Sequence, residues 1–93
     1  MNRKSITQSY VLTPDGSEYI LRYYLVVGQN AADTAEYGVM IEVCRMEQCA
    51  SETRFFTADE GAALKVIDLL ASGFVFPDTL DDVLENLEPV FGY

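Results

Sequence analysis

The two cysteines are the residues best suited to covalent chemistry, and the segment CRMEQC (Cys44 and Cys49) separates them by four residues. A structural zinc site normally takes four Cys or His ligands, and this chain offers two cysteines and no histidine. A thioredoxin-like motif has only two residues between its cysteines. Two interpretations stay open. Both residues are reduced thiols, or the segment is a hairpin turn that places them directly opposite each other, near the separation a disulfide needs.

Carboxylates gather near the C-terminal end, in the segment DTLDDVLENLEPVF. On a helix, Asp78 and Asp82 share a face, as do Asp81 and Glu85, and such pairs can hold a hard cation weakly. A solvated acidic face explains the same spacing without a ligand. The chain also lacks the sequence motifs of phosphate loops, dinucleotide sites and calcium loops. We therefore expect no catalytic residue, no metal, no cofactor and no enzymatic activity.

The charge balance narrows the classes of partner. The 93 residues carry a formal net charge of −9, and residues 51–93 contain two bases and nine acids. Such a surface repels nucleic acid and anionic membranes. Solubility alone is sufficient reason for it, but it also suits a basic protein partner. The acidic surface available to such a partner consists of Asp78, Asp81, Asp82, Glu85 and Glu88.

The first half of the chain contains segments in which alternate residues differ in character, and these segments should form the strands that position the residues above. Residues of one parity in the segment 18–27 form a wholly apolar face, which is typical of a central strand. Pro14 to Ser17 (PDGS) predicts a tight hairpin turn before it. The expected strands are residues 5–13, 18–27, 36–45 and 50–56, with a loop at 28–35 and a short turn at 46–49.

Two helices are expected to follow. The segment TADE fits a capping box in which Thr57 caps the first helix and Glu60 reaches back. This helix should end near Ser72, with Gly73 as its left-handed stop. Pro77 should begin a second helix, capped by Asp78 or Thr79 and ended by Pro89. The two apolar stripes are Ala63, Val66, Ile67, Leu70 and Phe74, then Leu80, Val83, Leu84, Leu87 and Phe91.

This order predicts a single α+β domain over residues 1–93, a two-layer ββββαα fold. It consists of a four-stranded antiparallel meander with both helices packed on one face. One helix is too short to cover a four-stranded sheet, so the second helix should also join the core. Its acidic face would then be the part left for a partner. The alternative is a detached amphipathic docking helix.

The sheet face away from the helices should carry more apolar side chains than a solvated face requires. The residues expected there are Ile20, Tyr24, Val26, Met40, Cys44 and Phe56, mixed with Glu18, Arg22, Glu42 and Arg54. Exposed apolar patches of this kind mark interfaces. We therefore expect a homodimer through this face or through an exposed edge strand. Cover by the N-terminal arm is the alternative.

Three sequence segments also resemble a known family. They are YGVMIEV (37–43), TADEGAALKVIDLL (57–70) and LDDVLENL (80–87). The stretch from Tyr37 to Leu87 is similar to a group of short proteins from anaerobic Firmicutes, known only as a domain of unknown function. Thr79 stands where that family pattern has a histidine, so no role of that histidine is carried over. The resemblance implies a bacterial cytoplasmic setting and no particular activity.

A protein-interaction or regulatory module that self-associates is therefore the function we expect. Two other classes stay open: a small-molecule-binding or minor enzymatic domain that uses the tyrosine-rich sheet with Tyr19, Tyr23 or Arg22, and an acidic mimic of nucleic acid. They can be distinguished, because a pocket needs converging polar groups in a concave site. No segment has the apolar length of a signal peptide or a membrane span, so a cytoplasmic location is expected.

Overall fold

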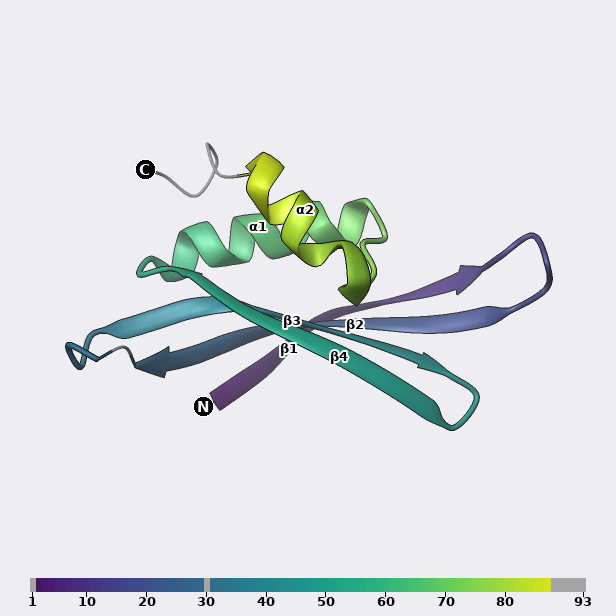
Figure 1. Ribbon diagram of the computed structural model, residues 1–93, viewed down its shortest axis with the longest axis horizontal. Coiled ribbons are helices and arrows are strands. Elements are labelled where there is room, and N and C mark those ends of the chain that lie inside the picture. The colour runs from purple at the N-terminus through teal and green to yellow at the C-terminus, as the bar shows by residue number, and fades with distance from the viewer. Residues whose placement is uncertain (1, 30, 88–93) are drawn as a thin grey trace.

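The computed structural model describes residues 2–29 and 31–87, which form one antiparallel sheet with two helices on the same side (Figure 1). The strands are neighbours in sequence order, so the predicted α+β meander followed by two helices is confirmed. The elements are β1 (Asn2–Leu12), β2 (Glu18–Gln29), β3 (Ala35–Arg45), β4 (Gln48–Thr57), α1 (Glu60–Ser72), the 3-10 turn η1 (Pro77–Thr79) and α2 (Leu80–Leu87).

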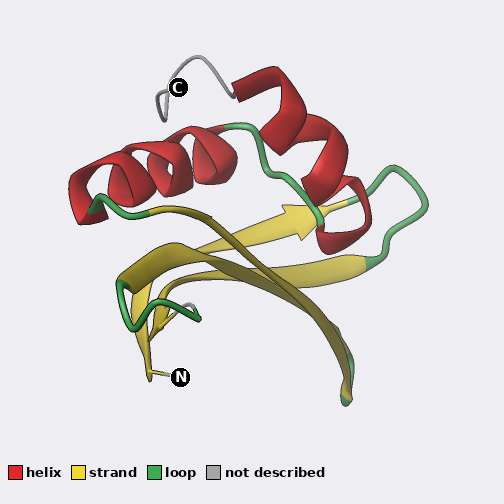
Figure 2. Cartoon of the chain, turned by 60° about the vertical axis from the view of Figure 1, so that its left-hand side comes forward, coloured by secondary structure: helices red, strands yellow, loops and turns green. Residues whose placement is uncertain are grey.

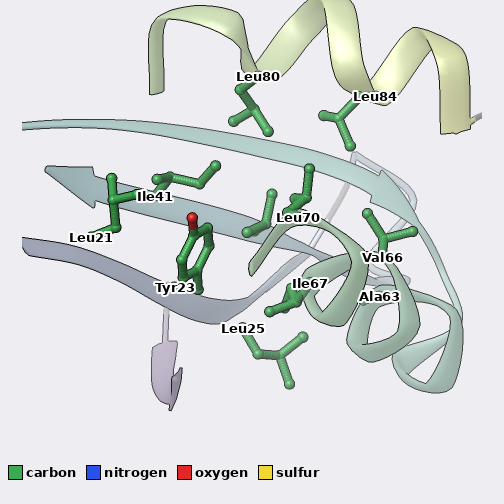
Figure 3. Packing of buried hydrophobic residues seen from close by; sticks show 11 residues of the cluster. Leu21, Tyr23, Leu25, Ile41, Ala63, Val66, Ile67, Leu70, Leu80 and Leu84 are labelled. Carbon is green, nitrogen blue, oxygen red and sulfur yellow. The ribbon is translucent and has the colours of Figure 1, made fainter. Parts of the chain in front are cut away.

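The hydrophobic core lies between the sheet and the two helices (Figure 3). The apolar face of β2 supplies Leu21, Tyr23 and Leu25, as its alternation predicts. From α2, Leu80 and Leu84 reach the same cluster, so the second helix is part of the core. Each fully buried aliphatic side chain contributes about 1.5–3 kcal/mol. The remaining core members are Val39, Ile41, Ala63, Val66, Ile67 and Leu70.

Two tight turns close the hairpins. In the first, the backbone N–H of Thr13 donates to Ser17 over 2.9 Å, and Gly16 has a φ of 88° that favours glycine. In the second, Arg45 pairs with Gln48 around a two-residue turn. Its first central residue is Met46, whose φ of 56° is usually adopted there by glycine. Both turns lie where the sequence predicts them.

The caps of α1 differ from the sequence expectation. Asp59, not Thr57, is the N-cap, because its carboxylate accepts the backbone N–H of Gly61 while Thr57 Oγ1 accepts from the N–H of Asp59. At the other end, Gly73 has a φ of −90°, and the left-handed residue is Phe74, with a φ of 51°. Bonds from Phe74 to Ala71 and from Val75 to Leu70 complete a Schellman motif.

Two residues of β4 lie on the opposite side of the sheet from the one expected. Arg54 pairs with Val39 on the helix side, and Phe56 packs against the core. The reason is that Cys49 pairs with Cys44, which puts residues 49, 51, 53 and 55 on the uncovered side. A register shift then leaves Phe56 as an extra residue of a bulge.

The second helix begins at Pro77, as expected, but its first turn is the 3-10 turn η1. Phe76 is the N-cap of η1 and makes no side-chain cap bond, whereas the Thr79 hydroxyl donates to the Phe76 carbonyl oxygen. The expected helix stop at Pro89 and the stripe member Phe91 lie outside the described residues.

Candidate functional site

Both described helices lie on one side of the sheet, and the other side, the outer face, is left without a described helix over it (Figure 2). Cross-strand pairing arranges its side chains in rows. From the Asn2 end of β1 toward the hairpin turns, the rows are Arg3, Val26, Gly38 and Phe55; Ser5, Tyr24, Met40 and Thr53; Gln8, Arg22, Glu42 and Ser51; then Tyr10, Ile20, Cys44 and Cys49.

Much of the apolar surface expected to be exposed here is already covered within one chain. Val26 is fully buried, and Met40 is nearly so. The guanidinium of Arg3 lies 4.9 Å from the ring centroid of Tyr24, and its NH1 is 3.9 Å from the sulfur of Met40. The first strand thus provides part of the cover, as the alternative interpretation held. Tyr24 and Ile20 are half-buried.

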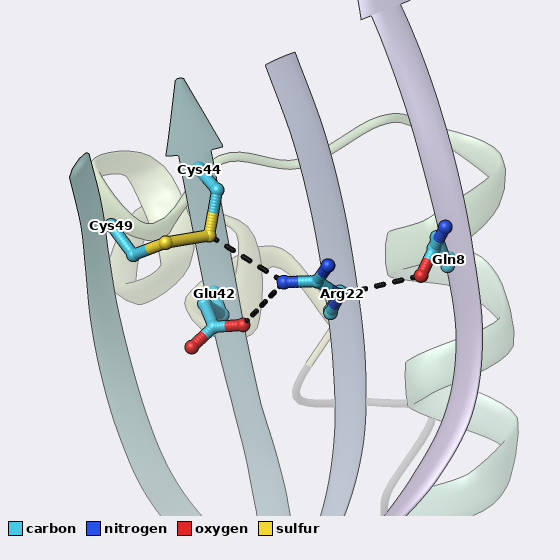
Figure 4. The surroundings of a disulfide bond; sticks show 5 residues. All are labelled: Gln8, Arg22, Glu42, Cys44 and Cys49. Atoms are coloured by element: carbon cyan, nitrogen blue, oxygen red, sulfur yellow. Dashed lines mark hydrogen bonds and ion pairs between the residues drawn. A yellow bond between two sulfur atoms is a disulfide. The ribbon is translucent and has the colours of Figure 1, made fainter. Parts of the chain in front are cut away.

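A polar row crosses the middle of the outer face. Arg22 NH1 donates to Glu42 over 3.1 Å and to the sulfur of Cys44 over 3.6 Å (Figure 4). Its Nε donates to the side-chain oxygen of Gln8 over 3.3 Å. One guanidinium therefore links β1, β2 and β3 through their side chains.

The cysteines form a disulfide, so the second of the two interpretations holds. Cys44 and Cys49 face each other in the β3–β4 register with their Cα atoms 4.1 Å apart. Cys44 is 6% exposed, whereas Cys49 lies exposed on the edge strand β4. Among the described residues, no three metal-binding side chains come together.

The three most exposed large apolar side chains of the described residues gather at the turn end of the sheet. Both hairpin tips lie at this end and splay apart (Figure 1), and a depression of about 610 Å³, the hairpin notch, lies there. Tyr10, Leu12 and Met46 line it, and they are 72%, 70% and 92% exposed, the highest values among large apolar residues in the described chain. The sequence interpretation did not single out these three residues, although Tyr10 and Leu12 share one face of the expected strand.

Exposed carboxylates line the start of the second helix. Asp78, Asp81, Asp82 and Glu85 are all exposed, while Glu88 lies outside the described residues. Asp81 accepts two hydrogen bonds from Arg54, of 2.7 and 3.1 Å, which tie α2 to β4. The guanidinium of Arg54 holds the pKa of Asp81 below its usual value. Asp81 is therefore already paired, and the other three described acids make up the rest of this surface.

The polar groups suggested for a tyrosine-rich pocket do not converge. Tyr23 is fully buried on the helix side, and its hydroxyl donates to the Val75 carbonyl oxygen over 3.0 Å. Burial raises the pKa of this hydroxyl to about 12. Arg22 lies on the outer face in its ion pair with Glu42. Tyr19 does line the hairpin notch, where its ring lies 5.8 Å from the guanidinium carbon of Arg45.

Comparison with known proteins gives a family and no activity. A family model described as a family of unknown function, DUF6514, matches residues 2–88, a wider span than the resemblance over residues 37–87. No curated protein and no solved structure matches the chain. Neither α1 nor α2, the helices of the described residues, has the length and apolar character of a membrane-crossing segment.

Proposed function

The chain belongs to this family of unknown function, and from that premise we propose that it is a protein-interaction module that pairs with a second copy of itself. The observation that carries the proposal is the hairpin notch, where Tyr10, Leu12 and Met46 present most of their apolar surface to water. Clustered exposed apolar residues of this size are typical of interfaces. The proposed contact covers these three side chains together with Ile20.

The charge distribution supports a second copy as the occupant. Each chain carries a net charge of −9, so two copies repel over most of their surfaces. The outer face is much less acidic, because its charged residues are two arginines and three glutamates, a net charge of 2 − 3 = −1. These residues are Arg3, Arg22, Glu18, Glu36 and Glu42. Contact through this face avoids bringing the acidic helix sides together.

The position of the patch also favours pairing. Tyr10 and Leu12 belong to β1, which is an edge of the sheet formed by the described residues. An edge strand offers backbone N–H and C=O groups to a partner strand. The proposed dimer therefore gains main-chain hydrogen bonds beside its apolar contact. A bacterial, cytoplasmic setting, and a basic partner for the acids of α2, remain parts of this proposal.

The mass in solution tests the proposal. We expect size exclusion with light scattering to give twice the chain mass of 10.4 kDa for the wild type. Leu12→Glu places a charge in the patch and should give a folded monomer. Leu69→Glu is the matched control, because Leu69 is 44% exposed on α1, away from the outer face. A wild-type monomer at high concentration, or equal effects of the two variants, would contradict the proposal.

A further inference from the structure

The two sulfurs of the disulfide are in different surroundings. Cys49 lies exposed on the edge strand β4, so a reagent in solution can approach its sulfur. Cys44 lies one strand further in and is almost fully buried. Figure 4 shows the Cys44 sulfur on the side of the bond that points toward Arg22. An incoming nucleophile therefore meets Cys49 first.

Arg22 is placed to receive negative charge on the inner sulfur. Its NH1 donates to the Cys44 sulfur over 3.6 Å. Guanidinium groups beside a cysteine favour the thiolate over the thiol, and a thiol that ionises more readily is a better leaving group in disulfide exchange. The same NH1 is shared with the carboxylate of Glu42 at 3.1 Å, which offsets part of this effect.

We propose that this disulfide is a reversible thiol-exchange site with a fixed direction of attack. The thiolate of a small thiol bonds to Cys49 Sγ, the Cys44–Cys49 bond breaks, and its electron pair leaves on Cys44 Sγ beside Arg22. A second molecule of the thiol then attacks the mixed disulfide. This second attack releases the two small-thiol molecules, joined as a disulfide, and leaves Cys44 and Cys49 as thiols. The two thiol molecules thus supply the two electrons.

The hairpin makes the exchange reversible. The β3–β4 register pairs Arg45 with Gln48 and Val43 with Ala50, on either side of the cysteines. These backbone pairs do not depend on the sulfur–sulfur bond. Reduction therefore leaves Cys44 and Cys49 facing each other, ready to form the disulfide again by the reverse exchange, in which a small-molecule disulfide takes up the two electrons and leaves as two thiols. This site adjoins the proposed dimer contact, because Cys44 lines the hairpin notch, so its test is also run on the Leu12→Glu variant to read it apart from self-association.

The direction of attack can be read by peptide mapping. The oxidised protein is treated briefly with reduced glutathione, and free thiols are then blocked with N-ethylmaleimide. Trypsin cuts after Arg22, Arg45 and Arg54, so Cys44 and Cys49 fall in separate peptides, residues 23–45 and 46–54. We expect glutathione on Cys49 and maleimide on Cys44. Glutathione on Cys44, or equally on both, would overturn the proposal.

The role of Arg22 is read from the rate of reduction. We expect Arg22→Gln to slow reduction by glutathione about threefold, because it removes the positive charge beside the Cys44 sulfur. We expect Glu42→Gln to speed reduction, because it removes the carboxylate that shares the Arg22 guanidinium. Arg22→Lys should restore most of the rate. Arg3→Gln is the matched control, since Arg3 lies over Tyr24 on the same face. Thermal unfolding confirms that each variant is folded. Equal rates for Arg22→Gln and Arg3→Gln would overturn the role of Arg22.

Discussion

The hydroxyl of Tyr23 donates a 3.0 Å hydrogen bond to the backbone carbonyl oxygen of Val75, and this bond joins the sheet to the segment between the helices. Tyr23 is fully buried, so its ring packs in the core while its one polar atom is satisfied at the edge of the core. Among the described residues, no buried side-chain nitrogen or oxygen lacks a partner. The bond thus fixes the connector that brings α2 over the sheet.

Removing this hydroxyl should destabilise the fold. Tyr23→Phe keeps the ring but leaves the Val75 carbonyl oxygen without its donor, so we expect the free energy of unfolding to fall by about 1 kcal/mol. Urea denaturation followed by circular dichroism measures the change. Tyr10→Phe is the control, because Tyr10 is exposed and its hydroxyl accepts a hydrogen bond from the exposed side chain of Gln8. An equal loss in both variants would contradict the role of the bond.

The same hydroxyl should set the alkaline limit of stability. Burial raises the pKa of Tyr23 to about 12, above the ordinary value of 10.0 that applies in the unfolded chain. Between these values the unfolded state has lost a proton that the folded state keeps, so raising the pH favours unfolding. The contribution of Tyr23 is intact below pH 10 and is lost progressively up to pH 12. Urea midpoints at pH 9, 10 and 11 should fall more steeply in the wild type than in Tyr23→Phe.

Most of the fold could be predicted because it depends on periodic patterns. The wholly apolar face of β2 and the stripes of the two helices require a sheet with both helices on one side. The single-residue departures could not be predicted in this way. The pairing of Cys49 with Cys44 sets the side to which β4 residues point, and the strand pattern alone does not fix this register; likewise, nothing in RFFT marks Phe56 as the extra residue of the bulge. The same applies to Phe74, since the sequence SGF suggested the glycine as the left-handed residue.

The candidate site was less predictable than the fold. The spacing of Cys44 and Cys49 allowed both thiols and a disulfide, and the sequence alone does not show that the hairpin register brings the two residues directly opposite each other. The exposure of Tyr10 and Leu12 depends on how the two hairpin tips splay apart, which is a property of the curved sheet. Conversely, Val26 is fully buried on the outer face, where it pairs with Arg3 and Gly38, and alternation within one strand does not reveal this burial.

Replacing Phe74 should stabilise the end of α1. Phe74 has a φ of 51°, a left-handed backbone conformation that costs about 1–2 kcal/mol for a residue other than glycine. Its side chain is 52% exposed, so its packing offsets only part of this cost. Phe74→Gly relieves this cost but adds freedom to the unfolded chain, for a net gain of about 0.5–1 kcal/mol. Thermal unfolding measures the gain.

Gly73→Ala is the matched control for Phe74→Gly. Gly73 has an ordinary φ of −90°, and an added Cβ would lie 3.6 Å from the Leu69 carbonyl oxygen, a normal contact. We therefore expect this variant to be within about 0.5 kcal/mol of the wild type. A loss of more than about 1 kcal/mol in Gly73→Ala, with no gain in Phe74→Gly, would show that the glycine is the left-handed residue.

Gly38 should be the least replaceable glycine in the sheet. A Cβ at this position would lie 1.9 Å from the carbonyl oxygen of Arg54, so the backbones of β3 and β4 would have to separate at the bulge. We expect Gly38→Ala to lower the free energy of unfolding by more than about 2 kcal/mol. Gly28→Ala is the control, because its Cβ would meet only the ring of Phe55 at 3.2 Å, and a half-exposed ring can turn aside. Urea denaturation should separate the two variants clearly, and a larger loss in Gly28→Ala would contradict the close approach of the two strands at Gly38.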